Sequence, residues 1–195
     1  ANEALQNGRT PYLKALQLFN GTVYRWNRPC YGITNGKPHL RIENRALPSG
    51  PTPADEIANA AFWFGLISGM AGKYGDIREV MLFDDAKINF FAAARLGLNA
   101  QFLWVDGEMI PARTLILEEL LPLARTGLEA GALNPKDIDR YLGIIEARVA
   151  SGRSGAGWIL DSYRTLRSQT STNEALTSLT ASLTENPKNG KPVHE

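Results

Sequence analysis

The sequence has little of what several protein classes require. Its 195 residues include a single cysteine, Cys30, so no disulfide can form within the chain, which favours a reducing compartment such as the cytoplasm. No apolar run reaches 18 residues and no signal-peptide layout opens the chain, which argues against membrane insertion and secretion. Lys and Arg number 21 against 20 Asp and Glu, so no overall charge attracts nucleic acid or an anionic membrane. Cys30 has no candidate base nearby and is expected to be a buried side chain.

The chain nevertheless has enough apolar content for a well-buried domain. Hydrophobic residues make up 44% of the sequence, which suffices for one core with a mobile tail. The chain opens Ala1-Asn2-Glu3 with no initiator methionine. We therefore expect a processed or cut chain, and so part of a longer protein.

One stretch, residues 39–45, combines a strand pattern with dense charge. Side chains alternate across a strand, so His39, Arg41, Glu43 and Arg45 share one side and the apolar residues between them the other. Such a face suits an anion and a metal, because guanidinium groups match phosphate or carboxylate oxygens and a glutamate can hold Mg²⁺. The alternative is a solvated strand face with cross-strand ion pairs. The stretch alone leaves both open.

A second strand precedes this one. Residues 22–28 are rich in aromatic and β-branched residues, and Asn35-Gly36 is a strong signal for a hairpin turn. The resulting register aligns the polar positions of the two strands: Arg28 with Glu43, Cys30 with Arg41, and Trp26 with Arg45. Pro29 and Pro38 lack the amide hydrogen that a strand ladder uses, so a bulge that shifts this register is the alternative.

Helical periodicity replaces strand alternation after residue 47. Residues 54–72 are apolar almost all round, which predicts a buried helix whose aromatic side chains lie in the core and do not stack on adenine. A helix is predicted from Asp84 to Leu96 with Gly97 as its stop. Asp84 and Asp85 are expected to cap this helix and not to bind a metal.

The remaining segments are mostly helical. A small hairpin is predicted around Asp106-Gly107, and Pro111 opens a helix that Pro122 should kink or split. Residues 135–149 carry an apolar helical stripe, and Ser171 begins a capping signal for a last helix. The predicted fold is therefore α+β: a small antiparallel sheet, the hairpin at about 22–46, packed by the buried helix and followed by a helical C-terminal bundle.

Several blocks together resemble the carboxylate-amine ligases of the glutamate-cysteine ligase type, and more distantly glutamine synthetase. The blocks occur in the family's order: residues 25–29, the strand and Pro-bearing turn at 39–52, the Ala-rich residues 58–62, and residues 89–100. The resemblance runs from about residue 20 to 160. It implies a glutamine synthetase-like fold of which this chain covers the C-terminal part.

The resemblance also implies a chemistry and its residues. Such ligases use Mg-ATP to make an acyl phosphate, which the amine then attacks. By this analogy Glu43 is the metal ligand, and Arg45 and Arg41 contact the transferred phosphoryl group or the substrate carboxylate. Arg28, Arg25 and Arg95 are the further candidates for binding substrate or ATP. The alternative for Arg95 is a surface arginine on an amphipathic helix.

The expected partners follow from the same resemblance. They are small molecules, glutamate or another carboxylate and an amine, together with the enzyme's N-terminal half; further copies of the chain are an additional candidate. A Mg-ATP site usually takes more than one carboxylate, so this chain alone is expected to be inactive. The predicted boundaries are 1–170 for the catalytic portion, 171–186 for a docking helix and 187–195 for a disordered tail. The alternative function is a non-catalytic helical binding or regulatory module.

Overall fold

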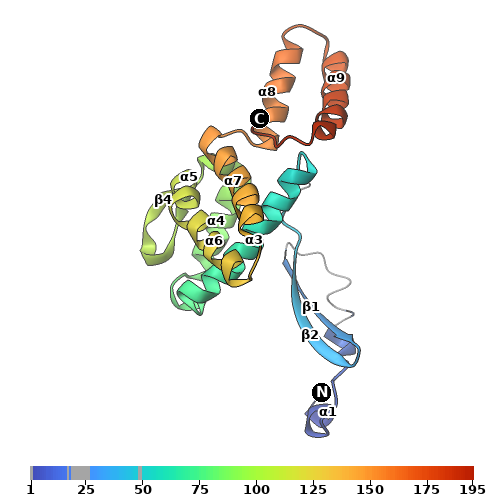
Figure 1. Cartoon of the computed structure of the whole chain (residues 1–195), viewed down its shortest axis with the longest axis vertical. Helices are drawn as coiled ribbons and strands as arrows, with labels where there is room; N and C mark the ends of the chain where they lie inside the picture. The colour runs from blue at the N-terminus through green and yellow to red at the C-terminus, as the bar shows by residue number, and fades with distance from the viewer. Residues whose placement is uncertain (1, 17, 19–26, 48–49) are drawn as a thin grey trace. The chain divides into compact units, whose positions relative to one another are not determined.

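The computed structural model describes residues 2–16, 18, 27–47 and 50–195 and divides the chain into two compact units. The first unit comprises Ala1–Ser49 and the second Gly50–Glu195. Each unit contains an antiparallel hairpin and helical segments (Figure 1). The predicted α+β class with a helical C-terminal region is confirmed. No helix among the described residues is long and apolar enough to cross a bilayer.

The first unit contains a short helix, α1 (Asn2–Gln6), and a hairpin of β1 (Asn27–Thr34) and β2 (Lys37–Asn44). The turn is the predicted one, because Asn35 and Gly36 both have positive φ, 51° and 76°, as a two-residue primed turn requires. The predicted register is confirmed over the described residues, with Arg28 opposite Glu43 and Cys30 opposite Arg41. The predicted pairing of Trp26 with Arg45 lies outside the described residues.

The two prolines cause no bulge, because each occupies a permissive position. The register runs without a break from Asn27↔Asn44 to Thr34↔Lys37. In a two-residue hairpin the flanking pair exchanges hydrogen bonds and the next pair does not. This alternation places Pro29 and Pro38 in pairs that do not exchange hydrogen bonds, where a missing amide hydrogen costs no ladder bond.

The apolar face of this hairpin is only partly covered within its own unit. The Tyr31 hydroxyl donates to the Pro11 carbonyl at 2.6 Å, which ties the preceding segment to β1. Leu40 and Ile42 on β2 stay 69% and 54% exposed. The hairpin therefore holds its shape through its turn and ladder more than through a core.

The second unit is helical, with a small hairpin of β3 (Gln101–Leu103) and β4 (Met109–Pro111) at the predicted place. Its helices are α3 (Pro53–Tyr74), α4 (Phe83–Leu96), α5 (Ala112–Leu115), α6 (Leu121–Ala130), α7 (Pro135–Ser151), α8 (Gly155–Arg167) and α9 (Thr172–Glu185). Shorter turns are η1 (Ile77–Glu79), η2 (Gly97–Asn99), η3 (Val105–Gly107) and η5 (Asn186–Asn189).

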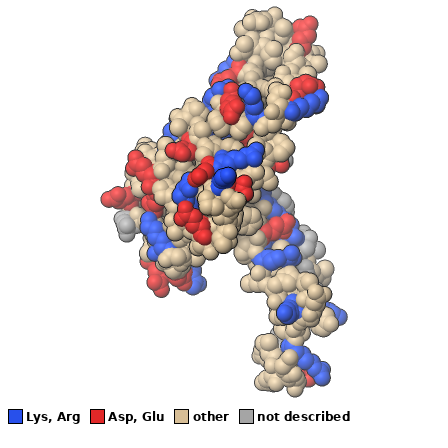
Figure 2. Space-filling view, viewed as in Figure 1, with Lys and Arg blue, Asp and Glu red and all other residues tan. Residues whose placement is uncertain are grey.

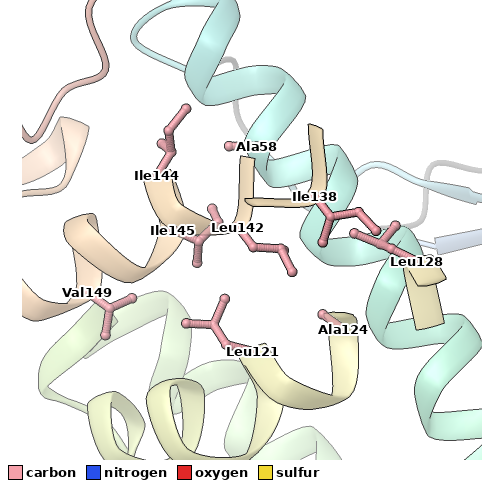
Figure 3. Close-up of a cluster of buried hydrophobic side chains, with 9 residues drawn as sticks. All are labelled: Ala58, Leu121, Ala124, Leu128, Ile138, Leu142, Ile144, Ile145 and Val149. Carbon is pink, nitrogen blue, oxygen red and sulfur yellow. The ribbon is translucent and has the colours of Figure 1, made fainter. Parts of the chain in front are cut away.

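The core of this unit lies where α3, α6 and α7 meet (Figure 3). Its buried side chains are Ala58, Leu121, Ala124, Leu128, Ile138, Leu142, Ile144, Ile145 and Val149. The predicted apolar stripe of α7 is confirmed, since its residues are all buried: Ile138, Leu142, Ile145 and Val149. The predicted capping box of α9 is also confirmed: the Ser171 hydroxyl accepts from the Glu174 amide, and the Glu174 carboxylate accepts from the Ser171 amide.

Helix α3 differs from the prediction of burial on nearly all sides. Only one of its faces is buried, while Ile57, Phe64 and Ile67 are 50%, 62% and 51% exposed. The buried face consists of small residues, which let the neighbouring backbone approach. Phe64 is therefore not a core residue, although its ring contacts Trp63 edge to face at 5.0 Å.

The close approach of α3 and α6 depends on three glycines. A methyl group on Gly127 would overlap the Gly65 carbonyl oxygen and lie 2.7 Å from the Gly69 nitrogen. Methyl groups on Gly65 and Gly69 would in turn overlap carbonyl oxygens of α6. Backbone atoms cannot move aside as a side chain can, so these positions admit no side chain without separating the helices.

Gly127→Ala is therefore expected to destabilise the second unit by about 1–3 kcal/mol, the usual cost of overpacking. Urea denaturation followed by circular dichroism measures this. Gly143→Ala in α7 is the matched control, because a methyl group there meets no atom within 4 Å. The control should stabilise by about 0.5–1 kcal/mol through helix propensity. Equal stabilisation by both substitutions would contradict the packing described.

Pro122 interrupts the helix that Pro111 opens, as predicted. Proline has no amide hydrogen, so the i→i−4 bond at this position is missing. The structure accommodates this with a π-helical stretch, η4 (Ile116–Leu120), directly before α6. The helix is split into three pieces, and the π-helical stretch carries Glu119.

A buried carboxylate joins three distant segments of the second unit. Asp55 is fully buried and its oxygens accept from the Thr52 hydroxyl at 2.9 Å, Arg148 Nη2 at 2.6 Å and the Val193 amide at 3.1 Å. Arg148 also donates to Asn59 Oδ1 at 2.6 Å. Val193 belongs to residues 187–195, the predicted tail, so one backbone amide of that segment bonds to the buried carboxylate.

Candidate functional site

The charged face of the β1–β2 hairpin gathers four of the six predicted site residues. Arg28, Arg41, Glu43 and Arg45 lie on or directly after the two paired strands. Arg28 Nη2 is 2.6 Å and Arg45 Nη2 is 3.1 Å from the same carboxylate oxygen, Glu43 Oε2. The Arg28 and Arg45 side chains are 23% and 22% exposed and that of Glu43 is 42% exposed. The hairpin register thus produces a carboxylate held between two guanidinium groups.

The remaining charged residues of β2 are arranged differently. Arg41 is exposed and forms no ion pair among the described residues. His39 lies across the sheet over Gly32, and its Nε2 is 3.0 Å from the Thr34 hydroxyl oxygen. His39 therefore faces the turn, and among the described residues Arg28 and Arg45 are the cations that pair with Glu43.

The Glu43 carboxyl has a pKa below its ordinary value. The hydrogen bond from Arg45 is the largest cause, burial opposes it, and the charges of Arg28 and Arg45 add to the lowering. Because the folded pKa lies below the unfolded one, this pairing stabilises the hairpin above the ordinary glutamate pKa. That contribution is lost as the pH falls through the folded value.

This arrangement has an excess of positive charge. Arg28 and Arg45 contact the one carboxylate, Glu43, and β2 carries a third arginine, Arg41, so the face suits the oxygens of phosphate or carboxylate groups. Glu43 can supply one oxygen to Mg²⁺, which commonly binds through one or two carboxylates together with substrate phosphates. No group of three or more metal-ligating side chains occurs among the described residues. The hairpin therefore combines an excess of guanidinium groups with a single carboxylate.

Cys30 belongs to this face and is half-buried, so the prediction of a buried side chain is wrong. Its Sγ lies 3.8 Å from Glu43 Oε2 and 3.7 Å from the Arg28 carbonyl oxygen. The pairing of Cys30 with Arg41 already placed it on the charged side. The alternation of side chains along the strand was therefore enough to place Cys30 on the charged face.

The other two predicted site residues are not on the described hairpin. Arg25 lies outside the described residues. Arg95 belongs to the second unit, where it is exposed near the end of α4 and forms no ion pair with a described residue. Asp84 and Asp85 lie in the first turn of the same helix, but Leu82 is at the N-cap and no side chain caps the helix, so the prediction that the aspartates cap it is wrong.

A second polar cluster, in the second unit, was missed by sequence reasoning. Glu119 Oε1 accepts from Lys73 Nζ at 3.0 Å, from Trp104 Nε1 at 3.2 Å and from the Tyr74 hydroxyl. Asn89 fixes the strand beside Trp104, because its amide donates to the Leu103 carbonyl and accepts from the Leu103 amide. Glu119 lies in η4 and its partners lie in α3 and beside β3, so no local spacing in the sequence predicts this cluster.

The Glu119 cluster predicts a pH dependence. Burial raises the pKa of the Glu119 carboxyl, but the hydrogen bonds from Tyr74, Lys73 and Trp104 together lower it below its ordinary value. The stabilisation is therefore complete above about pH 4.3, the ordinary glutamate pKa, and is lost as the pH falls through the lower folded value. The Trp104 indole NH resonance should move in that acidic range. In Glu119→Gln this movement should be absent; a wild-type resonance that titrates at or above the ordinary value would contradict the assignment.

Charge on the visible face of the second unit is mixed in sign. Figure 2 shows Lys and Arg side chains interspersed with Asp and Glu on the visible face of this unit. Arg125 contacts Asp139 at 2.7 Å, and Arg164 contacts Asp161 at 3.2 Å. The visible face thus offers no counterpart to the arginine excess of the hairpin.

Fold and hairpin together define an α+β protein with an arginine-rich hairpin. The chain belongs to glutamate-cysteine ligase family 2, because the model of that family matches residues 21–182, most of its length. The resemblance to these ligases is thereby confirmed, and ATP-dependent ligase chemistry is the activity of this family in general. No curated protein and no solved structure matches the chain.

Proposed function

We propose that the chain is part of an ATP-dependent carboxylate-amine ligase and that its hairpin is the phosphate-binding surface. The observation that supports this most is the Arg28–Glu43–Arg45 arrangement on a hairpin that also presents Arg41. Family membership supports the reaction class, since the matched residues include the whole hairpin.

The proposed reaction explains why such residues are needed. Amide formation from a carboxylate and an amine is unfavourable, so ATP first phosphorylates the carboxylate; the amine then attacks the carbonyl carbon and phosphate leaves. Mg²⁺, when bound, neutralises charge on the polyphosphate. Glu43 supplies it with an oxygen ligand. Arg45 and Arg41 hold the transferred phosphoryl group or the substrate carboxylate, and Arg28 keeps Glu43 ionised and oriented.

The remaining assignments are part of this proposal. The acceptor is glutamate or a similar carboxylate, with Arg25 and Arg95 as further contacts to substrate or ATP. Additional acidic metal ligands come from residues outside this chain, from the N-terminal half of the enzyme. The 195 residues alone therefore bind anions but do not ligate, and the enzyme works in the cytoplasm.

An activity assay on the full-length protein tests the proposal. Purified protein is incubated with ATP, Mg²⁺, glutamate and a panel of amines, while released phosphate and amide product are both measured. Equal amounts of phosphate and amide, dependent on Mg²⁺ and on both substrates, are expected. Phosphate release without amide, or no turnover with any carboxylate and amine pair, would favour the non-catalytic helical module instead.

A further inference from the structure

Residues 191–195 lie in a groove of the second unit that neither the hairpin nor the proposed reaction uses. Gly190 follows η5 with a positive φ of 66°, and the residues after it return to the start of α3. They form a β-turn, because the Glu195 amide donates to the Pro192 carbonyl at 3.1 Å. Three residues of this segment are half-buried: Pro192, Val193 and His194.

The groove contacts the segment through its main chain. The Val193 amide donates to Asp55 Oδ2 at 3.1 Å. Arg153 Nη1 donates to the His194 carbonyl oxygen at 3.0 Å. A backbone amide and a backbone carbonyl are present in almost every residue, so these two bonds select a peptide in the right turn and not a particular side chain. Two contacts spaced for consecutive residues favour a peptide over a small molecule as the ligand.

The acceptor for the Val193 amide is held in place without the segment. Asp55 Oδ2 also accepts from the Thr52 hydroxyl at 2.9 Å, and Asp55 Oδ1 accepts from Arg148 Nη2 at 2.6 Å. These partners belong to α3, to its N-cap and to α7. When the segment leaves, the carboxylate therefore stays paired and oriented, and the groove keeps its hydrogen-bond acceptor.

The segment is an incomplete match for the groove. A cavity of about 260 Å³ remains beside it, lined by Val193 together with Pro51 and Trp158. His194 Nδ1 is buried and has no hydrogen-bond partner within the part of the chain that the structure describes. Unfilled space loses dispersion contacts, and a buried polar atom without a partner costs free energy. A ligand with a larger apolar side chain at the position of Val193 would therefore bind better than the chain's own segment.

We propose that this groove is a binding site for a turn-forming peptide of another protein, which residues 191–195 occupy as a weak internal ligand. The partner peptide places a backbone amide against Asp55 and a backbone carbonyl against Arg153. Its apolar side chain, larger than that of Val193, enters the cavity. The internal segment competes at the high effective concentration of a tethered ligand, so only a better-fitting peptide displaces it.

Fluorescence anisotropy with labelled peptides tests this on the 195-residue chain. The resident peptide has the sequence of residues 186–195 with both ends blocked, and a second peptide carries leucine in place of Val193. A third carries N-methyl-leucine there, which removes only the amide hydrogen. The receptors are the wild type, Val193→Pro and Val193→Ala. Val193→Pro removes the donor to Asp55 from the internal segment, while proline suits the second position of a β-turn. Val193→Ala is the matched control that keeps the donor.

The leucine peptide should bind Val193→Pro saturably and about fourfold more tightly than the resident peptide, the gain from one buried CH₂ group. N-methylation should weaken binding by tenfold or more, since a hydrogen bond to a carboxylate is lost. The wild type and Val193→Ala should bind at least tenfold more weakly than Val193→Pro, because the internal segment stays in place. Adding Arg153→Met to Val193→Pro should weaken binding several-fold, because the contact to the peptide carbonyl is lost.

Three results would overturn the proposal. They are no saturable binding of the leucine peptide to Val193→Pro, equal binding of the N-methylated peptide, and equal binding to all three receptors. Circular dichroism shows whether each variant is folded, and Val193 lies outside the buried core of the unit, so none is expected to unfold. Hydrogen exchange of the Val193 amide in the wild type is a second measurement. Slow exchange is expected, and exchange at the rate of an unstructured peptide would contradict occupation of the groove.

Discussion

Asp55→Ala is expected to destabilise the second unit by about 3–5 kcal/mol, the usual cost of removing one partner of a buried ion pair. Asp55 is fully buried and the Arg148 side chain is only 15% exposed. Without the carboxylate the guanidinium keeps a bond to Asn59 but loses its counter-charge in a site that water scarcely reaches. The Val193 amide and the Thr52 hydroxyl lose their acceptor at the same time.

Chemical denaturation of Asp55→Ala and of Asp161→Ala separates the loss of the buried ion pair from the loss of an exposed one. Asp161 also pairs with an arginine, but both side chains are more than 70% exposed, so its removal should cost no more than about 1 kcal/mol. Adding Arg148→Met to Asp55→Ala removes the stranded charge and should recover part of the stability. A loss in Asp55→Ala no greater than in Asp161→Ala would contradict the assigned role of the buried pair.

Glu43→Gln is expected to lower ligase turnover of the full-length protein by about 10²-fold or more, with little loss of fold. Glutamine keeps the shape of the side chain but not the charge that pairs with Arg28 and Arg45 and that we propose binds Mg²⁺. Stability should change little, since the carboxylate is 42% exposed. Turnover is measured by amide formation at several Mg²⁺ concentrations, and excess metal should recover part of the loss.

Glu129→Gln is the matched control for this substitution. Glu129 also faces an arginine, Arg125 at 4.0 Å, but it lies on α6 at 57% exposure and outside the hairpin. It should retain wild-type turnover. Intact turnover in Glu43→Gln would show that Glu43 is not the metal ligand.

The hairpin and its charged face were predictable because local rules determine them. Asn35 and Gly36 accept the positive φ that a two-residue turn demands, and strand parity then decides which side chains meet. Arg28 therefore lies opposite Glu43 as predicted. His39 departs from the pattern because the facing Gly32 leaves room for its ring to turn toward Thr34.

Features that depend on tertiary contact could not be derived in this way. Composition suggested burial all round α3, but the glycines at 65 and 69 direct one face against α6 and leave Phe64 exposed. The Asp55 network joins positions 138 residues apart, and Glu119 meets Tyr74 from 45 residues away. Such long-range pairings follow from helix packing, which periodicity alone does not specify.

NMR of arginine side chains tests directly whether the hairpin is a phosphate-binding surface. The guanidinium NεH resonances of the 195-residue chain are followed while ATP is added, with and without Mg²⁺. We expect the signals of Arg28, Arg41 and Arg45 to shift together and saturate, and those of Arg125 and Arg164 in the second unit to stay in place. Shifts confined to the second unit, or no saturable change at the hairpin, would contradict the assignment.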